Sequence, residues 1–117
     1  KIWEVVTGAC LVTLQWRLQE YRNHIGSAVF SPDGSSVLTG ATDNCAKVWD
    51  TLQGSCTLTL GPHEGKVGEG VLASFSGDGT LIATVSTSRT AKIFDATTGA
   101  LLHVLMHKRQ TSVAAFL

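Results

Sequence analysis

The sequence predicts an all-β protein, an array of four-stranded antiparallel units, on three observations. Three segments that begin at Lys1, Lys47 and Lys92 align without gaps, 46 and 45 residues apart. A second pair aligns from Ala28 and Ala73, again 45 residues apart, and a fixed period of this length indicates a repeat architecture. The elements are short, rich in Val, Ile, Leu and Thr, and separated by turn residues, as antiparallel strands are.

Taken in chain order, these elements give eleven strands. Residues 1–14 predict the last two strands of one unit, joined by a turn from Glu4 to Gly8. Residues 15–60 and 61–105 each predict a complete unit of four strands. Residues 106–117 lead into the first strand of a further unit, placed at 112–117. The chain starts and stops inside this pattern, so we expect it to be part of a longer protein.

The turns within the complete units carry specific turn chemistry. Ser31 to Gly34 reads SPDG, with Pro to preset φ and Gly for the permissive corner of a tight turn. Ser76 to Gly79 repeats it as SGDG. Asp50 to Gly54 and Asp95 to Gly99 are second turns of the same kind. Each turn therefore joins two strands as a hairpin.

These residues resemble the WD40 repeat family: FSPDG, then a Leu-Thr-Gly strand, then Asp43 six positions before Trp49. The resemblance covers nearly the whole chain and implies a β-propeller segment, in which each unit is a blade and the blades ring a channel. Two complete blades are too few to close a ring, so we expect an incomplete ring here.

The resemblance also implies a buried hydrogen-bonded network that ties the strands of a blade together. In the first complete unit the matching residues are His24, Thr39, Asp43 and Trp49. His24 lies six residues before Phe30, whereas His107 lies nine residues before Phe116. This role is structural, because a buried carboxylate or indole N–H is tolerated only when it is paired. The second unit keeps Thr84 but has Ser88 and Phe94 in place of Asp43 and Trp49, so we expect it to depend on packing.

Composition and charge exclude several classes of function. Nine Lys and Arg balance nine Asp and Glu, so no net field favours nucleic acid or an anionic membrane. No apolar run approaches the roughly 18 residues of a membrane span, and the start lacks the features of a signal peptide. Three cysteines without a CxxC pair are interpreted as reduced, half-buried strand residues. We interpret the chain as soluble and intracellular, cytoplasmic in preference to nuclear.

Motifs for cofactors, metals and catalysis are absent from the sequence. Gly61 to Lys66 has three residues between its glycines and Val67 after the Lys, so it does not match a P-loop. His63-Glu64 lacks the second His of a zinc protease signature. His103 is interpreted as a partly buried polar substitution in preference to a metal ligand. We expect no cofactor, no small-molecule substrate and no catalytic residue.

Function in a propeller is carried by the loops, since the blades are a rigid frame. The connection that follows Leu14 has an insertion that combines aromatic residues and arginines, the types enriched at interface hot spots. The alternative is that its aromatic side chains pack against the neighbouring blade while its arginines are solvated. The candidate partner-contact residues are Trp16, Arg17, Tyr21, Arg22, Arg89, Lys108 and Arg109.

Two functions of different class fit these observations. The first is a non-catalytic protein-interaction scaffold, a subunit of a multiprotein assembly whose partners are other proteins, as the resemblance implies. The second is a propeller appended to an enzyme whose catalytic part lies outside these residues. More sequence on either side of the 117 residues would separate the two.

Overall fold

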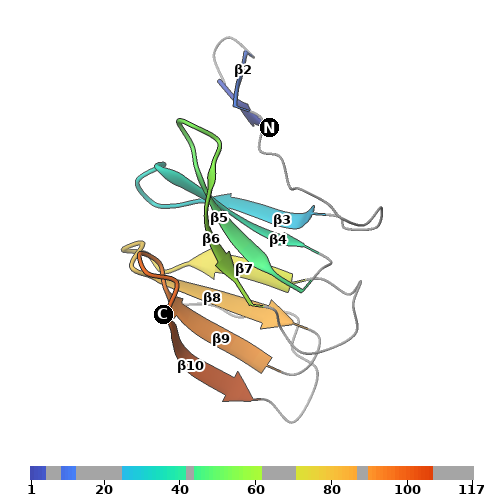
Figure 1. The fold of residues 1–117 in the computed structure, drawn as a ribbon, viewed down its shortest axis with the longest axis vertical. Coiled ribbons are helices and arrows are strands. Elements are labelled where there is room, and N and C mark those ends of the chain that lie inside the picture. The colour runs from blue at the N-terminus through green and yellow to red at the C-terminus, as the bar shows by residue number, and fades with distance from the viewer. Residues whose placement is uncertain (5–8, 13–24, 42–43, 62–70, 87–89, 107–117) are drawn as a thin grey trace.

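The computed structural model describes residues 1–4, 9–12, 25–41, 44–61, 71–86 and 90–106. Within these ranges the chain forms ten β-strands and no helix, arranged in two four-stranded sheets and one two-stranded sheet (Figure 1). The all-β prediction is thereby confirmed. The eleventh predicted strand, at 112–117, lies outside the described residues.

Each four-stranded sheet is an antiparallel meander in which consecutive strands pair. The first sheet contains β3 (Ile25–Phe30), β4 (Ser36–Ala41), β5 (Ala46–Asp50) and β6 (Cys56–Leu60). The second sheet contains β7 (Val71–Phe75), β8 (Leu81–Ser86), β9 (Thr90–Asp95) and β10 (Leu101–Met106). The small sheet pairs β1 (Ile2–Trp3) with β2 (Cys10–Val12) and lies beyond the first sheet (Figure 1).

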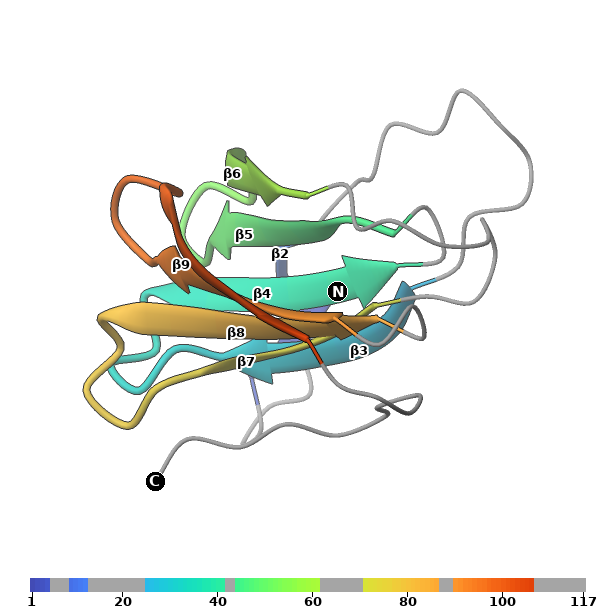
Figure 2. The same cartoon turned by 90° about the horizontal axis from the view of Figure 1, so that it is seen from below.

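Four hairpin turns of the two large sheets, those between β3 and β4, β5 and β6, β7 and β8, and β9 and β10, gather at one end of the strands (Figure 2). Their glycines have positive φ, 75° at both Gly34 and Gly79, and 72° and 76° at Gly54 and Gly99. An L side chain rarely adopts this left-handed backbone, which explains why glycine ends each turn. The turn pattern of the sequence therefore defines one rim of the molecule.

The core lies between the two sheets. Leu38 pairs with Val48 across β4 and β5, so both side chains point to the same face of the first sheet. Ile82 pairs with Phe94 on the facing side of the second sheet. Alternation of side chains along each strand assigns these positions to one layer. The buried cluster consists of Leu38, Ala46, Val48, Leu60, Val71, Ile82 and Phe94.

The backbones approach most closely where Gly40 of β4 meets β7. A Cβ on Gly40 would overlap the carbonyl oxygen of Val71 and would lie 3.0 Å from the Ser27 hydroxyl oxygen. Only glycine therefore fits, because any side chain would separate the two sheets. Gly40 fixes how near the second sheet can stand to the first.

The opposite face of the first sheet is covered less completely. Phe30 is 59% exposed, whereas Phe75, at the same repeat position in the second sheet, packs against the core. The difference arises because the first sheet lies in front of Phe75, while only the short β1–β2 sheet lies on the outward side of Phe30. Lys1 and Ile2 of that small sheet form one wall of a cleft over Phe30 and Val37.

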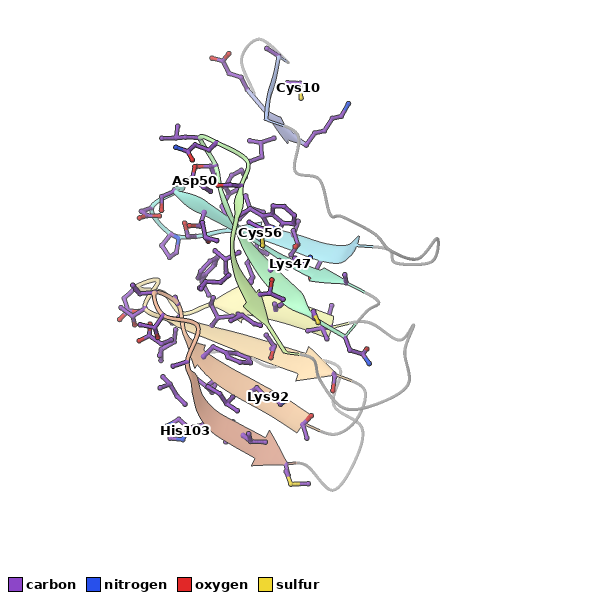
Figure 3. All side chains as sticks on the ribbon, viewed as in Figure 1. Cys10, Lys47, Asp50, Cys56, Lys92 and His103 are labelled. Atoms are coloured by element: carbon purple, nitrogen blue, oxygen red, sulfur yellow. The ribbon has the colours of Figure 1, made fainter. Side chains whose placement is uncertain are left out.

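Two expectations about exposure were wrong. Cys10 and Cys56, labelled in Figure 3, are exposed rather than half-buried. Cys45 is half-buried as expected, but it precedes β5 instead of lying within a strand. His103 is exposed rather than partly buried. The same reason applies to Cys10, Cys56 and His103. They lie on β2, β6 and β10, the last strands of their sheets, where neighbouring elements cover side chains least. All three cysteines lie within the described residues, and no disulfide joins them.

Candidate functional site

A buried hydrogen bond connects two strands of the first sheet. The indole Nε1 of Trp49 donates to the Thr39 hydroxyl oxygen at 2.9 Å, and both residues are buried. Trp49 pairs with Val37 across the strands, so its ring shares the outward face of the sheet with Thr39. Asp43 and His24, the other two residues of the implied network, lie outside the described residues.

The second sheet has the same position without the indole. Phe94 is buried in the core where Trp49 stands in the first sheet, and Thr84 is fully buried beside it. A phenyl ring has no N–H to donate, so this position contributes through packing against Leu38 and Val48. Ser88, at the position of Asp43, lies outside the described residues.

Two hairpin turns are built around a carboxylate with the same set of hydrogen bonds. In the first turn, Asp33 Oδ1 accepts from the Ser31 hydroxyl at 2.7 Å, the Ser35 amide at 2.9 Å and the Ser35 hydroxyl at 2.7 Å. The Ser36 amide then donates to Ser31 Oγ at 3.0 Å. Three donors on one carboxylate oxygen stabilise its charged form.

In the second turn, Asp78 accepts from Ser76, the Thr80 amide and the Thr80 hydroxyl at 2.8, 3.0 and 2.7 Å. The hydrogen bonds from the Ser35 amide first, and then from the two hydroxyls, lower the pKa of Asp33 to about 2. The Thr80 amide and the two hydroxyls of the second turn do the same for Asp78. These carboxylates therefore hold the turns together.

The other two turns use an aspartate at their start. Asp50 accepts from the amides of Leu52 and Gln53, both at 2.8 Å. Asp95 accepts from the amides of Thr97 and Thr98 at 2.8 and 2.9 Å, and these hydrogen bonds, Thr98 first, lower its pKa. Such bonds cap the strand end by occupying amides that the sheet leaves unpaired.

A shallow polar groove separates the Asp33 and Asp78 turns at the rim. A Cβ on Gly79 would lie 3.3 Å from the Pro32 Cδ, so the two turns are almost in contact. Val48 and Phe75 line the groove along with the turn residues. Because both carboxylates take part in the turns, we assign the groove a structural role.

Each residue predicted to contact a partner lies outside the described residues. These are Trp16, Arg17, Tyr21, Arg22, Arg89, Lys108 and Arg109. Sequence reasoning missed a different surface, the exposed strand β10. The signal was present in the repeat alignment, where Leu102 and Val104 replace Thr57 and Thr59 of β6.

Two searches of the described ranges gave negative results. No group of three or more His, Cys, Asp or Glu side chains in them is placed to hold a metal ion. No helix in the same ranges is long and apolar enough to cross a membrane.

Comparison with known proteins gives relatives of one kind. The chain is 34% identical over 64 residues to a Periodic tryptophan protein 2 homolog of Dictyostelium discoideum, a match that covers 49% of this chain and 7% of that protein. The homolog from Mus musculus is 38% identical over 60 residues, with coverage of 45% and 6%. WD repeat-containing protein 86 of Homo sapiens is 40% identical over 48 residues, with coverage of 41% and 13%. The chain thus matches a small part of each relative's length.

The family model described as WD domain, G-beta repeat matches residues 13–50 and 54–95. The first match ends with β5, and the second contains β6 to β9. Together the two matches take up more than half of the chain, which therefore belongs to the WD40 repeat family.

Proposed function

We propose that this chain is part of a WD40 propeller that acts as a non-catalytic scaffold, a subunit of a multiprotein assembly that binds other proteins. Membership of the WD40 family supports a repeat frame with binding loops. The balanced charge of the chain is consistent with protein partners in preference to nucleic acid.

One observation carries this proposal: among the described residues, four aspartates and a buried threonine, side chains of types that catalysis uses, are engaged in holding the frame. Asp33, Asp50, Asp78 and Asp95 accept hydrogen bonds from their own turns. The Thr39 hydroxyl is engaged by Trp49. Such bonds stiffen the hairpins, and a stiff frame lets connecting loops present side chains to a partner at a low entropic cost.

In this proposal the chain is divided into blades. Residues 15–60 and 61–105 are complete blades, 1–14 supply the last two strands of a preceding blade, and 106–117 supply the first strand of the next. The pairing of β3 to β6 and of β7 to β10 into separate meanders supports the division.

We place the partner-binding surface on the connections that enter the blades. The insertion with Trp16, Arg17, Tyr21 and Arg22 is its centre, and Arg89, Lys108 and Arg109 add basic contacts. The turns that contain Gly34, Gly54, Gly79 and Gly99 lie at one end of the strands (Figure 2), and we assign the partner-binding surface to the other rim. A second surface on the rim of the turns would need different residues.

The test compares protein complexes formed by two variants of the native, full-length protein. Changing Trp16, Tyr21 and Arg22 together to Ala is expected to remove one or more partners from the complex isolated by affinity purification, with an unchanged circular dichroism spectrum. The control is Leu52→Ala, in a hairpin turn where Leu52 is 89% exposed. An unchanged set of partners in the triple variant contradicts the placement of the surface.

The compartment in this proposal is intracellular, cytoplasmic in preference to nuclear. It is supported by three thiols that no disulfide joins, two of them exposed, a state that persists in a reducing environment. Fluorescence localisation of the native protein, tagged at either end, tests it. A signal confined to the secretory pathway or the nucleus would contradict it.

A further inference from the structure

Strand β10 is the most apolar exposed element that the structure describes. All six of its residues are exposed, and five of them are apolar. Leu101, Leu102, Val104 and Leu105 are 46–49% exposed, and Met106 is 80% exposed. β10 is also the last strand in the order β10-β9-β8-β7, so among the described residues it pairs only with β9 and has one free backbone edge.

From His103 to Met106 this edge lacks the devices that protect sheet edges. Proteins place Lys, Pro, inward-pointing charges or bulges on edge strands, because a bare edge pairs with other chains. β10 reads LLHVLM, with His103 as its one polar residue, and its irregularity in register is limited to the step from Leu101 to His103. From His103 to Met106 the strand is regular.

The equivalent strand of the first sheet, β6, does not have this run of exposed apolar residues. At the positions of Leu101 and Val104, β6 has Cys56 and Thr59. Both are exposed, and they lie on the face of β6 that pairs with Trp49 and Lys47. The apolar replacements are therefore an exposed surface that the repeat does not require.

A further blade would not cover this surface. The second sheet covers one face of β6, where Leu60 is 1% exposed and Leu58 is half-buried, while Cys56 and Thr59 on the other face stay exposed. A third sheet stacked in the same way would cover His103 and Leu105 of β10. It would leave Leu101, Val104 and Met106 exposed.

The exposed stripe is continuous with the interface between the sheets. Leu101 pairs with Phe94, which belongs to the buried core, and Val104 and Met106 follow on the same face opposite Lys92 and Thr90. An apolar segment placed along β10 would therefore extend a packed layer that already exists. The length of β10 decides which kind of partner can bind along it.

Six strand residues span about 20 Å. A stable dimer buries about 800 Å² per partner, far more than one strand edge of this length provides. The edge thus suits a single extended peptide segment better than a second copy of this chain.

We propose that β10 is a docking edge for an extended apolar segment of a partner protein, which adds to the second sheet as a fifth strand. The inference rests on the proposed scaffold function and names the kind of segment bound. Main-chain hydrogen bonds to the free edge provide affinity, and side chains beside Leu101, Val104 and Met106 provide selectivity for apolar residues.

The test titrates the native, full-length protein with a fluorescent, end-capped peptide of alternating Val and Thr flanked by Lys. Saturable binding by anisotropy is expected. The same peptide N-methylated at every Val and Thr should not bind, because neither of its edges can donate main-chain hydrogen bonds to β10. Equal binding of the two peptides overturns the proposal.

Variants locate the binding on β10. Val104→Lys should weaken the affinity for the peptide by about tenfold or more, because Lys protects an edge from pairing. Thr59→Lys, at the same repeat position in β6, is the matched control and should leave affinity unchanged. If Val104→Lys does not fold, a variant that combines Met106→Thr with Val104→Thr, the residue that β6 has at that position, should also weaken binding. Equal loss in the Thr59→Lys control overturns the proposal.

Three further outcomes bear on this inference and on the scaffold proposal. Concentration-dependent dimers that Val104→Lys abolishes and Thr59→Lys keeps would identify a second copy as the occupant and overturn the inference. Peptide binding by a native protein that purifies without any partner supports the docking edge and contradicts the scaffold. Retention of every native partner by Val104→Lys contradicts the docking edge and leaves the scaffold in place.

Discussion

Trp49 and Phe94 occupy the same repeat position in two adjacent sheets, yet they stabilise the fold differently. Trp49 donates a hydrogen bond to the buried Thr39 hydroxyl, while Phe94 fills the core between the sheets. A buried hydroxyl that loses its partner costs free energy, whereas a buried ring contributes mainly through its contacts. Loss of a polar partner should therefore change the contribution of Trp49 to the free energy of unfolding, but not that of Phe94.

We predict that Trp49→Ala lowers the free energy of unfolding by about 3–5 kcal/mol, the usual cost of truncating a buried aromatic residue. Trp49→Phe should cost about 1–3 kcal/mol, because it leaves the Thr39 hydroxyl without its indole donor. Denaturant unfolding of the native, full-length protein measures both changes. A Trp49→Phe variant that is as stable as the parent protein would contradict a contribution from the hydrogen bond.

A double-mutant cycle isolates the hydrogen bond itself. Thr39→Val and Trp49→Phe are expected to be non-additive by about 0.5–3 kcal/mol, since the two residues share one interaction. The implied role of Asp43 can be tested by the same cycle with Trp49. Additive effects of Thr39→Val and Trp49→Phe would show that the bond contributes nothing to stability.

At the scale of the element, each hairpin turn is a small polar unit that repeats with the sheets. Asp33 and Asp78 accept hydrogen bonds from equivalent donors in their turns, with distances within 0.1 Å of one another. Replacement of Pro32 by Gly77 in the second turn leaves this arrangement intact. The carboxylate, more than the proline, is thus what the two turns share.

We predict that acid weakens these turns. The pKa of Asp33 and Asp78 is about 2 in the folded state, against an ordinary value of 3.8. A folded-state pKa below the unfolded value adds stability that is complete above pH 3.8 and is lost as the pH falls toward about 2. Stability should therefore fall with pH in this window.

The check is thermal unfolding of the native protein between about pH 4.5 and about pH 2, a range that includes both the ordinary and the lowered pKa of these carboxyl groups. Asp33→Asn with Asp78→Asn should flatten the dependence, and Leu52→Ala should leave it unchanged. An equally steep dependence in the double variant would assign the acid sensitivity to other groups.

We predict that Gly40→Ala destabilises the contact between the two sheets, because the new methyl group would overlap the carbonyl oxygen of Val71 in β7. Gly77→Ala is the matched control, since nothing lies within 4 Å of its Cβ position. Hydrogen exchange of the β4 and β7 amides in the native protein measures the effect. Equal protection in both variants would mean that β7 moves away without cost.

The order of the strands was predictable from the sequence, because the repeat of 45 residues places equivalent turns at equivalent positions. The exposure of His103 and Cys56 was not, because periodicity does not show which strand of a sheet is outermost and uncovered. The contact at Gly40 was also missed, since a glycine in a strand pattern looks the same whether or not another backbone approaches it. Of the candidate site, the resemblance implied Thr39 and Trp49, while the replacement of Thr57 and Thr59 by Leu102 and Val104, which marks β10, was not recognised as a surface signal.

At the scale of the whole molecule, the two sheets form an arc whose outer faces are incompletely covered. Phe30 is exposed on one side and the whole of β10 on the other. In repeat proteins each unit is stabilised mainly by its neighbours, so uncovered terminal faces lower stability. The arc is therefore expected to depend on contacts beyond its own two sheets.

We predict that residues 1–117 alone oligomerise, aggregate or unfold over a broad transition, because apolar faces and strand edges stay bare. Sedimentation velocity with thermal unfolding at several protein concentrations measures this. A sharp, monomeric transition that does not depend on concentration would contradict the prediction.

The contact at Gly40 also bears on the curvature of the arc. The second sheet has Val85 at the equivalent position, so its β8 presents an isopropyl group where β4 presents a bare backbone. A blade stacked on the second sheet has to stand further away at that point than the second sheet stands from the first. Successive angular steps around the propeller axis are then unequal, and the first step, set by a missing methyl group, is the tighter of the two.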